Sequence, residues 1–374
     1  MPELNQKHIA LFISSMRGGG AERVTLNLGT EFAKLGHKVD LILVTKEGPY
    51  LKEVPEYIRV LSFFVPFRKR FRTLLNTFPL AIYLRREKPD VVLSAMNHCN
   101  VVALMAKILS GAKTRAAISE HNTFSIAGKT LGFFKRMITP KLMRLLYPKA
   151  DTIIAVSKNV ADDLAQSIGI PRERIEVIYN PVISPEIYEK AKEKINHPYF
   201  PSSSLKIIIG VGRLTEQKDF PTLIKAFAKV KQKIDANLII LGEGEDRKKL
   251  EKLIENLNLK EYIDLPGFVK NPYAFMAKAD LFVLSSKWEG LPTTLIEAMA
   301  CGTPVVSTDC PSGPAEILEN GKYGKLVPVG DVEALAEAME EALDNPIDPV
   351  KLQERAGYFS AERAISGYLE VMNI

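Results

Sequence analysis

The sequence predicts two doubly wound α/β domains joined in tandem. Short apolar runs alternate with helix-length amphipathic segments along almost the whole chain. Continuous apolar strands separated by helices are typical of a parallel sheet that is covered on both faces. The alternation is interrupted once, by the proline- and serine-rich stretch 180–204, and then starts again. A length of 374 residues is ample for two such domains, each with its own core.

The first domain is expected to span residues 1–184. Helices are predicted between several of its strands, among them Ala21–Leu35, which Gly36 would end, and Lys158–Ile168, which Ser157 would cap. The predicted strands are His8–Ser14, Lys38–Val44, Arg59–Phe63, Asp90–Leu93, Arg115–Ser119, Asp151–Val156 and Ile175–Ile178.

Residues 185–204 are expected to form a linker, and residues 205–359 the second domain. A helix is predicted at Pro221–Lys233, and a last helix at about 360–374 is expected to pack back on the first domain. The predicted strands are Leu205–Val211, Asn237–Leu241, Asp280–Ser285, Thr303–Ser307 and Lys325–Val329. Because doubly wound sheets bind ligands beyond the carboxyl ends of their strands, a ligand is expected between the two domains.

The composition is that of an ordinary globular protein, with 46% hydrophobic and 25% charged residues. Cys99, Cys301 and Cys310 lack C-x-x-C spacing, which argues against a disulfide framework or a zinc site and favours a reducing compartment. The N-terminal apolar run 9–13 is too short for a signal peptide, and no run approaches the ~18 apolar residues of a membrane span. We therefore expect a cytoplasmic protein that does not cross a membrane.

Positive charge is concentrated in the first domain. Between Arg59 and Lys149 there are 17 Lys and Arg residues against three acidic ones, whereas the whole chain has a net charge of +6. The rest of the chain is therefore acidic, and this asymmetry favours an anionic partner for the first domain.

Two segments of this basic region, 64–75 and 131–147, mix basic with large apolar side chains and predict binding to an anionic membrane surface. Two alternatives remain open: the apolar faces are buried in the domain core, or the basic residues bind a diphosphate of the substrate. The basic residues assigned to this patch are Arg68, Lys69, Arg70, Arg72, Lys135 and Arg136.

The first motif is Gly18-Gly19-Gly20, between the first predicted strand and the first helix. Glycines let backbone N–H groups approach a phosphate or a sugar without interference from a Cβ atom. The motif is not G-x-G-x-x-G, and no ribose-binding acid follows at the expected distance, which disfavours a dinucleotide site. A simple tight turn is the alternative.

The second motif is Gly212-Arg213-Leu214-Thr215-Glu216-Gln217-Lys218, directly after the first strand of the second domain. A guanidinium and an ammonium group on a loop at the carboxyl end of a strand suit a diphosphate. The alternative is a surface loop with two solvated charges.

The third motif runs from Trp288 to Gly302 and includes Glu289-Gly290-Leu291-Pro292-Thr293 and Glu297. A helix at Pro292–Ala300 would direct free N–H groups toward an anion. Glu297, more than one turn into that helix, could accept hydrogen bonds from both hydroxyls of a ribose, and Glu289 could hold a sugar.

The fourth motif is Ser119-Glu120-His121-Asn122, at the end of a strand in the basic domain. A histidine at this edge of the sheet could donate a hydrogen bond to a sugar hydroxyl or a phosphate, although a lone histidine can equally be structural.

Taken together and in this order, the glycine loop, E-H-N, G-R-L-x-x-x-K and E-G-L-P-T-x-L-I-E resemble the family 4 glycosyltransferases with the GT-B fold. The likeness runs from Gly18 to Glu316, and Glu289 and Glu297 match the family's E-x(7)-E element. It implies two Rossmann-like domains facing each other across a cleft. The first domain would bind the acceptor and the second the nucleotide sugar, and the enzyme would retain the anomeric configuration of the sugar.

The resemblance also implies roles for single residues. Arg213 and Lys218 would neutralise the leaving diphosphate, Glu297 would hold the ribose, and Glu289 would contact the sugar. His121 would contact the sugar near the reacting carbon. The remaining donor contacts implied are Gly19, Gly20, Leu291, Pro292 and Thr293 at the diphosphate, and Phe268 and Val269 at the base. Family members need no metal or other cofactor, because positive side chains and a helix end take the place of a cation.

A closer likeness, in G-G-A-E-R-V at 19–24, S-E-H at 119–121 and the third motif, is to enzymes that build polyprenyl-diphosphate-linked oligosaccharides. It implies a UDP-sugar donor, often UDP-N-acetylgalactosamine, and a lipid-linked saccharide acceptor in cell-surface glycan or glycoprotein glycan assembly. The basic segments 64–75 and 131–147 predict peripheral attachment to the cytoplasmic face of a membrane.

Other functions are alternatives to this interpretation. A UDP-sugar epimerase of the same fold would also bind UDP, but needs acids and bases that remove a sugar proton. A family 4 transferase with a GDP-sugar donor or a soluble acceptor also fits the motifs. A nucleic-acid partner is not expected, because no groove-reading helix or aromatic platform accompanies the basic charge. A glycogen-type phosphorylase is excluded by the lack of a cofactor-bearing lysine motif.

Overall fold

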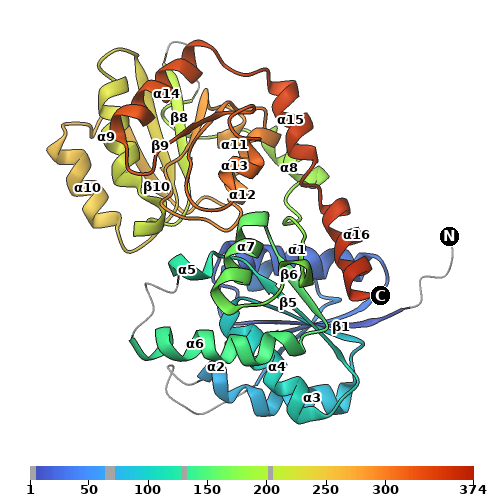
Figure 1. Cartoon of the computed structure of the whole chain (residues 1–374). Coiled ribbons are helices and arrows are strands. Elements are labelled where there is room, and N and C mark those ends of the chain that lie inside the picture. Colours follow the sequence, from blue (N-terminus) through green and yellow to red (C-terminus); the bar gives the residue numbers. More distant parts are fainter. Residues whose placement is uncertain (1–5, 64–71, 128–132, 201–204) are drawn as a thin grey trace. The chain divides into compact units, whose positions relative to one another are not determined.

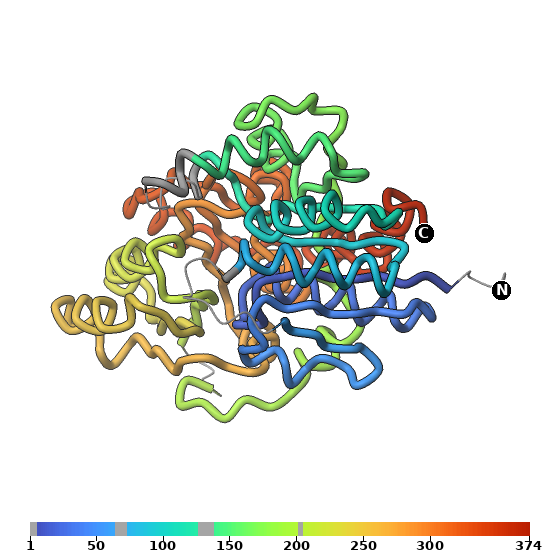
Figure 2. Tube along the Cα trace, turned by 90° about the horizontal axis from the view of Figure 1, so that it is seen from below, coloured from blue at the N-terminus to red at the C-terminus, as the bar shows by residue number. Residues whose placement is uncertain are grey.

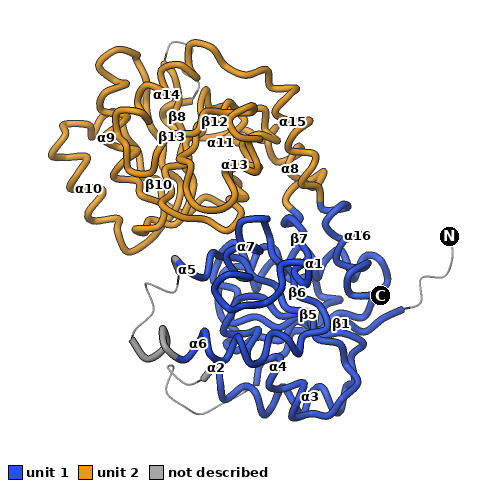
Figure 3. The backbone as a smooth tube through the Cα atoms, viewed as in Figure 1, with its two compact units in different colours: residues 1–181, 361–374 blue, residues 182–360 orange. Residues whose placement is uncertain are grey.

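The computed structural model describes residues 6–63, 72–127, 133–200 and 205–374, with only the backbone described at 72, 126–127 and 133–137. The chain divides into two compact units (Figure 3). Unit 1 contains residues 1–181 and 361–374, and unit 2 contains residues 182–360. The two doubly wound α/β domains expected from the sequence are confirmed.

Unit 1 is built on a seven-stranded sheet in the order β3-β2-β1-β4-β5-β6-β7, and all of its pairings are parallel. The central strands are apolar and buried on both faces, which is why they appear in the sequence as continuous apolar runs. The strands are β1 (His8–Ile13), β2 (Lys38–Leu43), β3 (Arg59–Ser62), β4 (Val91–Ala95), β5 (Arg115–Glu120), β6 (Thr152–Ala155) and β7 (Ile175–Val177).

Helices cover both faces of this sheet. Figures 1 and 2 show α3, α4 and α6 side by side along one face, whereas α1 and α16 pack together on the other. The helices of unit 1 are α1 (Gly20–Lys34), α2 (Arg72–Leu75), α3 (Thr77–Glu87), α4 (Asn97–Ser110), α5 (Phe124–Ala127), α6 (Phe133–Leu146), α7 (Lys158–Ile168) and α16 (Ala361–Met372).

The last helix, α16, is part of the core of unit 1. Tyr368 and Met372 are fully buried in the same cluster as Leu11 and Phe32, and the Thr152 hydroxyl donates to the Val371 carbonyl at 2.9 Å. The end of the chain therefore completes the first unit, as the pattern of the sequence led us to expect.

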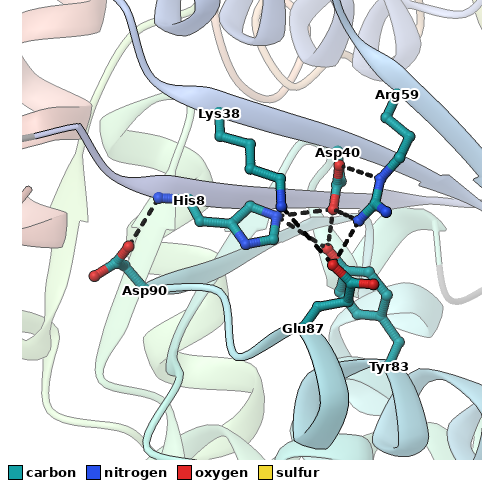
Figure 4. Close-up of polar contacts among 7 residues, drawn as sticks. All are labelled: His8, Lys38, Asp40, Arg59, Tyr83, Glu87 and Asp90. Atoms are coloured by element: carbon teal, nitrogen blue, oxygen red, sulfur yellow. Dashed lines mark hydrogen bonds and ion pairs between the residues drawn. The ribbon is translucent and has the colours of Figure 1, made fainter.

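A charged cluster lies at the amino-terminal ends of β1, β2 and β3 (Figure 4). The carboxylate of Asp40 is fully buried and accepts from Arg59 Nε at 2.8 Å and Nη2 at 2.6 Å, from His8 Nε2 at 2.8 Å, and from the Tyr83 hydroxyl. Burial alone would raise the pKa of Asp40, but the hydrogen bonds from Arg59, Tyr83 and His8 lower that pKa to about 2. Glu87 accepts from Arg59 Nη2 at 2.9 Å, so the cluster fixes the edge strand β3 and helix α3 to the sheet.

Unit 2 is built on a six-stranded parallel sheet in the order β10-β9-β8-β11-β12-β13. As in unit 1, the strand order reverses beside the first strand, here between β8 and β11, and such a point is where doubly wound sheets bind ligands. The strands are β8 (Lys206–Val211), β9 (Ala236–Leu241), β10 (Ile263–Gly267), β11 (Leu281–Leu284), β12 (Val305–Thr308) and β13 (Lys325–Val327).

The helices of unit 2 also form two layers. Helices α9 and α14 pack together over one face with Leu223, Phe227, Leu335 and Met339 in their core, while α12 packs with α15 and α11. The helices are α8 (Pro185–Ala191), α9 (Phe220–Val230), α10 (Arg247–Asn256), α11 (Pro272–Met276), α12 (Thr293–Ala300), α13 (Pro314–Ile317), α14 (Val332–Asp344) and α15 (Pro349–Gly357).

The structure differs from the sequence-based expectation in three places. Residues 185–204 contain helix α8, which packs on α11 and α12, so this stretch belongs to unit 2 instead of forming a free linker. Pro292 is the residue before α12 and not its first residue, since its ψ of 96° is extended. Strand β10 was not expected, because Pro266 and the acidic Asp264 mask its short apolar pattern.

The predicted Ser157 cap of α7 is confirmed, because the Ser157 side chain accepts a hydrogen bond from the Val160 N–H.

Among the residues described, no helix is both long enough and apolar enough to pass through a bilayer.

Candidate functional site

The loop after β8 carries Arg213 and Lys218 at the point where the strand order of unit 2 reverses. Leu214 anchors this loop: its side chain is buried, its N–H donates to the Glu243 carbonyl at 2.9 Å, and its carbonyl accepts from the Asp246 N–H at 3.0 Å. A Cβ atom at Gly242 would lie 1.9 Å from the Gly212 carbonyl oxygen, so glycine is required for the two loops to meet. The exposed side chain of Arg213 thus stands on a rigidly held backbone.

Lys218 forms an ion pair with Glu289 across the same point of the sheet. Lys218 Nζ is 2.6 Å from Glu289 Oε1, and the two side chains are only 16% and 8% exposed. The Ser286 hydroxyl donates to the same carboxylate oxygen at 2.7 Å, and the Ser285 hydroxyl donates to the Lys218 carbonyl at 2.8 Å. Lys218 and Glu289 are 71 positions apart in the sequence and belong to different motifs. The structure brings these two predicted site residues into direct contact.

Gln217 joins the same two loops. Its side-chain Nε2 donates to the Trp288 carbonyl at 2.9 Å and lies 3.5 Å from Glu289 Oε2. Its backbone carbonyl accepts from the Lys287 N–H at 2.8 Å. Gln217 therefore ties the loop of Lys218 to the loop of Glu289, and its contact to Glu289 Oε2 is a long one.

The turn at Gly290-Leu291-Pro292 is braced by the loop that follows β12. The Ser312 hydroxyl donates to the Gly290 carbonyl at 2.7 Å, and the Glu289 N–H donates to the Pro311 carbonyl at 3.2 Å. A Cβ atom at Gly313, where φ is +96°, would lie 2.3 Å from Pro292 Cδ. The start of α12 is thereby aligned with the Lys218 and Glu289 side chains.

Helix α12 begins at Thr293 without a side chain that caps its first N–H groups. The Thr294 hydroxyl in this first turn is buried and has no hydrogen-bond partner among the described residues. Unsatisfied buried polar atoms are rare, and one at the start of a helix is consistent with a ligand that accepts hydrogen bonds there. Glu297, the predicted ribose ligand, follows one turn later and is half-buried.

Phe268 and Val269 directly follow edge strand β10. The Phe268 side chain is 61% exposed, which is unusual for a large aromatic residue in a well-packed unit. Along the sheet edge, this pair stands two strands away from the loop of Arg213 and Lys218.

In unit 1, the glycine loop connects β1 to α1, with Gly19 in the cap position and Gly20 as the first helical residue. Gly18 adopts a φ of +100°, which favours glycine. A Cβ atom at Gly19 would lie 2.2 Å from Glu22 Oε2. An acidic side chain therefore lies over the amino end of α1, and it would have to turn away before a phosphate could bind there.

His121 follows β5 in unit 1, at the same edge of that sheet as the glycine loop and two strands away from it. Its Nε2 atom is 3.1 Å from the Ser119 hydroxyl, which lies 3.4 Å from the Tyr368 hydroxyl of α16. Burial lowers the pKa of His121 to about 4, so the imidazole is neutral near pH 7. It can exchange hydrogen bonds with a ligand but adds no positive charge.

Glu120, next to His121, is a buried carboxyl group whose network contains no basic side chain among the described residues. It accepts from the Tyr147 hydroxyl and from Asn100 Nδ2 at 2.9 Å, and Asn100 Oδ1 in turn accepts from the Ser94 hydroxyl at 2.8 Å. Burial raises the pKa of Glu120 to about 7. This network holds the chain on the amino-terminal side of His121.

Of the six basic residues assigned to the membrane patch, Arg68, Lys69 and Arg70 lie outside the described residues. Arg72 begins α2 and Lys135 and Arg136 lie in α6, with their side chains outside the description. The described residues add exposed apolar side chains on α3 and α6. Phe78 and Ile82, one turn apart on α3, are 64% and 53% exposed, and Leu145 on α6 is 63% exposed.

Sequence reasoning missed several residues that shape these sites: Gln217, Ser286, Thr294, Glu120 and Tyr368. Glu120 stood inside a recognised motif, but its partners Asn100 and Tyr147 come from distant helices and left no local signal. Tyr368 is 249 positions from Ser119 and resembles any buried aromatic residue of an amphipathic helix.

Comparisons with known proteins match both halves of the chain. The model of "Glycosyltransferase Family 4" matches residues 18–183, and that of "Glycosyl transferases group 1" matches residues 191–362. A Campylobacter jejuni protein is 35% identical over 342 residues, which cover 90% of each chain; it is N-acetylgalactosamine-N,N'-diacetylbacillosaminyl-diphospho-undecaprenol 4-alpha-N-acetylgalactosaminyltransferase. A second relative from C. jejuni, an alpha-1,4-N-acetyl-D-galactosaminyltransferase, is 28% identical over 90% of this chain and 89% of its own length.

Solved structures agree in fold. The Anabaena protein HepE, in complex with UDP and glucose, superposes with a TM-score of 0.81 over 98% of this chain and all of its own, at 20% identity. At that identity the likeness bears on the fold alone.

Proposed function

The chain belongs to the family 4 glycosyltransferases of the GT-B fold, and on that premise we propose that it transfers a sugar from a UDP-sugar to a polyprenyl-diphosphate-linked saccharide. The transferred unit is a hexose or N-acetylhexosamine, with N-acetylgalactosamine as the first choice. The observation that carries this proposal is the 35% identity, over nine tenths of both chains, to an enzyme named for that donor sugar and an undecaprenyl-diphosphate acceptor. The product would enter cell-surface glycan or glycoprotein glycan assembly.

In this proposal unit 2 binds the nucleotide diphosphate. The ammonium group of Lys218 is paired with the carboxylate of Glu289, and a bound diphosphate would be a second anionic partner for it. Arg213 would add a guanidinium group, and the uncapped start of α12 would donate backbone N–H groups. Leu291, Pro292 and Thr293 supply the backbone at this point. Glu297 binds the ribose, and the exposed Phe268 with Val269 frames the base.

Glu289 contacts the hydroxyls of the donor sugar in the proposed complex. Because Lys218 and Ser286 both bind Oε1, the carboxylate is held in one orientation while Oε2 can accept from a sugar hydroxyl. His121 contacts the sugar as a neutral imidazole. Gly20 leaves the backbone of unit 1 open for the diphosphate, and at Gly19 the Glu22 side chain would turn away on binding.

The reaction is proposed to retain the anomeric configuration, with the leaving phosphate helping to deprotonate the acceptor hydroxyl. Negative charge grows on the leaving oxygen as the glycosidic bond breaks, and Arg213 and Lys218 are the groups that would stabilise it. Two positive side chains at this place would make a divalent cation unnecessary, so we propose metal independence. An α-configured product from an α-configured donor, read by NMR of the product, supports retention, and a β-configured product contradicts it.

The donor and acceptor can be tested together. UDP-GalNAc, UDP-GlcNAc, UDP-Gal, UDP-Glc and GDP-Man are each incubated with a synthetic polyprenyl-diphosphate saccharide, and the product is read by mass spectrometry. We expect a mass gain of one or more N-acetylhexosamine units with UDP-GalNAc, and none with the matched Lys218→Ala variant. Transfer from GDP-Man only, or transfer to the free saccharide but not to the lipid-linked one, would contradict the proposal. Acceptor-independent conversion of the UDP-sugar to its epimer would identify an epimerase instead.

We also propose that unit 1 binds the cytoplasmic face of a membrane. The support is the excess of basic residues between 59 and 149 together with the exposed Phe78 and Ile82 on α3 and Leu145 on α6. Apolar side chains at the acyl boundary and basic ones at the lipid phosphates cooperate, with each basic residue contributing up to about 1 kcal/mol near an anionic leaflet.

Vesicle flotation tests membrane binding. We expect recovery with anionic vesicles to fall when Arg68, Lys69, Arg70 and Arg72 are all changed to Ser, and to fall separately in Phe78→Ser/Ile82→Ser. Val350→Ser, which removes an equally exposed apolar side chain from α15 of unit 2, is the control and should float like the wild type. Equal recovery of all four proteins with neutral and anionic vesicles would refute surface binding and leave the transferase assignment intact.

A further inference from the structure

A short chain of hydrogen-bonding side chains leads from His121 into the core of unit 1. His121 Nε2 lies 3.1 Å from the Ser119 hydroxyl, and that hydroxyl lies 3.4 Å from the hydroxyl of Tyr368 on α16. Ser119 is 2% exposed and Tyr368 is fully buried. Ser119 and Tyr368 are buried and His121 is partly exposed, so the hydrogen bond between the two hydroxyls must be arranged among these groups themselves.

The direction can be worked out from the buried end. Burial raises the pKa of Tyr368 to about 12, so its O–H proton is present at neutral pH. Within the described residues, Ser119 Oγ is the only acceptor in reach of that proton. A buried hydroxyl proton without an acceptor costs about 1–3 kcal/mol, so Tyr368 donates and Ser119 accepts.

Ser119 is then left with a single proton of its own to place. Tyr368 and Ser119 bring one proton each to the two hydrogen bonds of this chain, so an unprotonated His121 Nε2 gives both protons an acceptor. An Nε2–H group would leave one of three protons without an acceptor among the described residues. We infer that Tyr368 is a positioning residue that acts through Ser119 to hold His121 in the Nδ1–H tautomer. The ring then offers a donor at Nδ1, for which no described residue is a hydrogen-bond partner.

The backbone around Ser119 is too constrained to escape this arrangement. The Ser119 carbonyl accepts from the Met96 N–H at 3.1 Å and from Asn100 Nδ2 at 3.0 Å. Asn100 is itself held by Glu120, in the network with Tyr147. The serine side chain therefore stays between His121 and Tyr368.

This inference deepens the proposed function and rests on it in one respect, namely that His121 contacts the donor sugar. A neutral imidazole fixed as Nδ1–H can donate to a sugar or leaving-group oxygen, whereas the other tautomer would present only a lone pair there and could accept a hydrogen bond but not donate one. A mixture of tautomers would leave only part of the enzyme competent at any moment.

The tautomer can be observed without any assay of transfer. In protein labelled with ¹⁵N-histidine, protonated and unprotonated ring nitrogens have well-separated shifts, and long-range couplings to the ring protons distinguish Nδ1 from Nε2. The chain has five histidines, and the His121 signals are those absent from His121→Gln. In the wild type at pH 7 we expect protonated Nδ1 and unprotonated Nε2.

Two variants interrupt the chain at different links. Tyr368→Phe removes the donor while keeping the ring, so the Ser119 hydroxyl can turn and both tautomers should appear. Ser119→Ala should do the same, whereas Ser119→Thr, which keeps a hydroxyl, should restore the wild-type signals. Thr152→Val removes another hydrogen bond between α16 and the sheet without touching Ser119, and it should leave the tautomer unchanged.

Three results would overturn the inference. These are an Nε2–H tautomer in the wild type, a Tyr368→Phe spectrum identical to that of the wild type, and a Thr152→Val spectrum that shows the same mixture as Tyr368→Phe. If Tyr368→Phe does not fold, Ser119→Ala and Ser119→Thr make the same test. In turnover, Tyr368→Phe should lower kcat by about two- to tenfold, the range for one hydrogen bond, with little change in KM. Absence of lipid-linked transfer would refute the proposed function and leave the spectroscopic result standing.

Discussion

Asp40 in unit 1 and Glu289 in unit 2 are both buried carboxylates that bind a basic side chain, but they lie at opposite ends of their sheets. Asp40 lies near the amino-terminal ends of the strands and accepts from Arg59, His8 and Tyr83, which use both of its oxygens. Glu289 lies beyond the carboxyl end of β11, where Lys218 and Ser286 share Oε1 and Oε2 has only a long contact to Gln217.

This difference separates a structural ion pair from one suited to a ligand. Asp40 has no capacity left for another donor, and its partners tie β1, β2, β3 and α3 together. Glu289 and Lys218 each keep hydrogen-bonding capacity at the edge of the sheet where doubly wound folds bind ligands. Burial and a salt bridge alone do not distinguish the two, but the number of unused donor and acceptor positions does.

The largest expected effect is on turnover in unit 2. Lys218→Ala and Arg213→Ala should each lower kcat, by roughly 10²–10³-fold for the better-buried Lys218, because in the proposed reaction their contacts strengthen as negative charge develops on the leaving diphosphate. Steady-state kinetics with varied donor tests this. Lys325→Ala, an exposed lysine paired with Glu341, is the control. A rise in KM with unchanged kcat in both variants would remove the role assigned here.

The next effect is on stability in unit 1. Asp40→Asn should lower the free energy of unfolding by on the order of 3 kcal/mol, because it leaves Arg59 and His8 without their buried anionic partner. Activity per folded molecule should stay at the wild-type level, since the cluster is far along the strands from the ligand-binding edge. Urea unfolding and turnover are measured on the same preparation. Lost activity in a fully folded Asp40→Asn protein would contradict the division between the two sites.

The same carboxylate predicts a pH dependence. The pKa of Asp40 is lowered from its usual value to about 2 in the folded state, so its contribution is fully present above pH ~4 and is lost as the pH falls through about 2. The loss should amount to ~2 kcal/mol for a shift of this size. Urea unfolding of the wild type and of Asp40→Asn along this acid range should give two curves that converge. Parallel curves would show that Asp40 is not the group responsible.

A smaller effect is expected at the ribose. Glu297→Ala should weaken donor binding by roughly tenfold or more, the value of a charge-assisted hydrogen bond, with a lesser change in kcat. Calorimetric titration with UDP measures it directly, and Glu297→Gln, which keeps one acceptor oxygen, should lose less. Unchanged affinity for UDP in Glu297→Ala would remove the ribose assignment.

The smallest expected effect comes from removing metals. Turnover in excess EDTA should equal turnover without it, because Arg213 and Lys218 supply the positive charge at the diphosphate in our proposal. Complete loss of activity on chelation, restored by Mg²⁺ or Mn²⁺, would falsify metal independence.

The fold could be predicted because its determinants are local. Apolar runs such as 9–13 and 207–211 mark buried parallel strands, and Ser157 marks a helix start by its own hydrogen bond. The short strand β10 escaped prediction because edge strands need fewer apolar residues, and α8 escaped because four prolines in the stretch 180–204 suggested a linker.

The candidate site could be predicted only in part. Two separate motifs predicted Lys218 and Glu289 as site residues. The loops after β8 and β11 that carry them meet because these two strands are neighbours where the strand order reverses. Contacts that depend on long-range packing gave no signal. Ser119, for example, receives its partner Tyr368 from the last helix of the chain, and the buried Glu120 has partners on α4 and in the turn after α6.

The return of α16 to unit 1 has a consequence for how the protein is made. Residues 361–374 supply Tyr368 and Met372 to the core of a unit whose other residues end at position 181. During translation the ribosome must synthesise all of unit 2 before this helix emerges, so unit 2 can finish folding while unit 1 still lacks one wall of its core. The amino-terminal unit, begun first, is therefore the one completed last, and chains that stop short of residue 361 would expose the apolar surface that α16 covers.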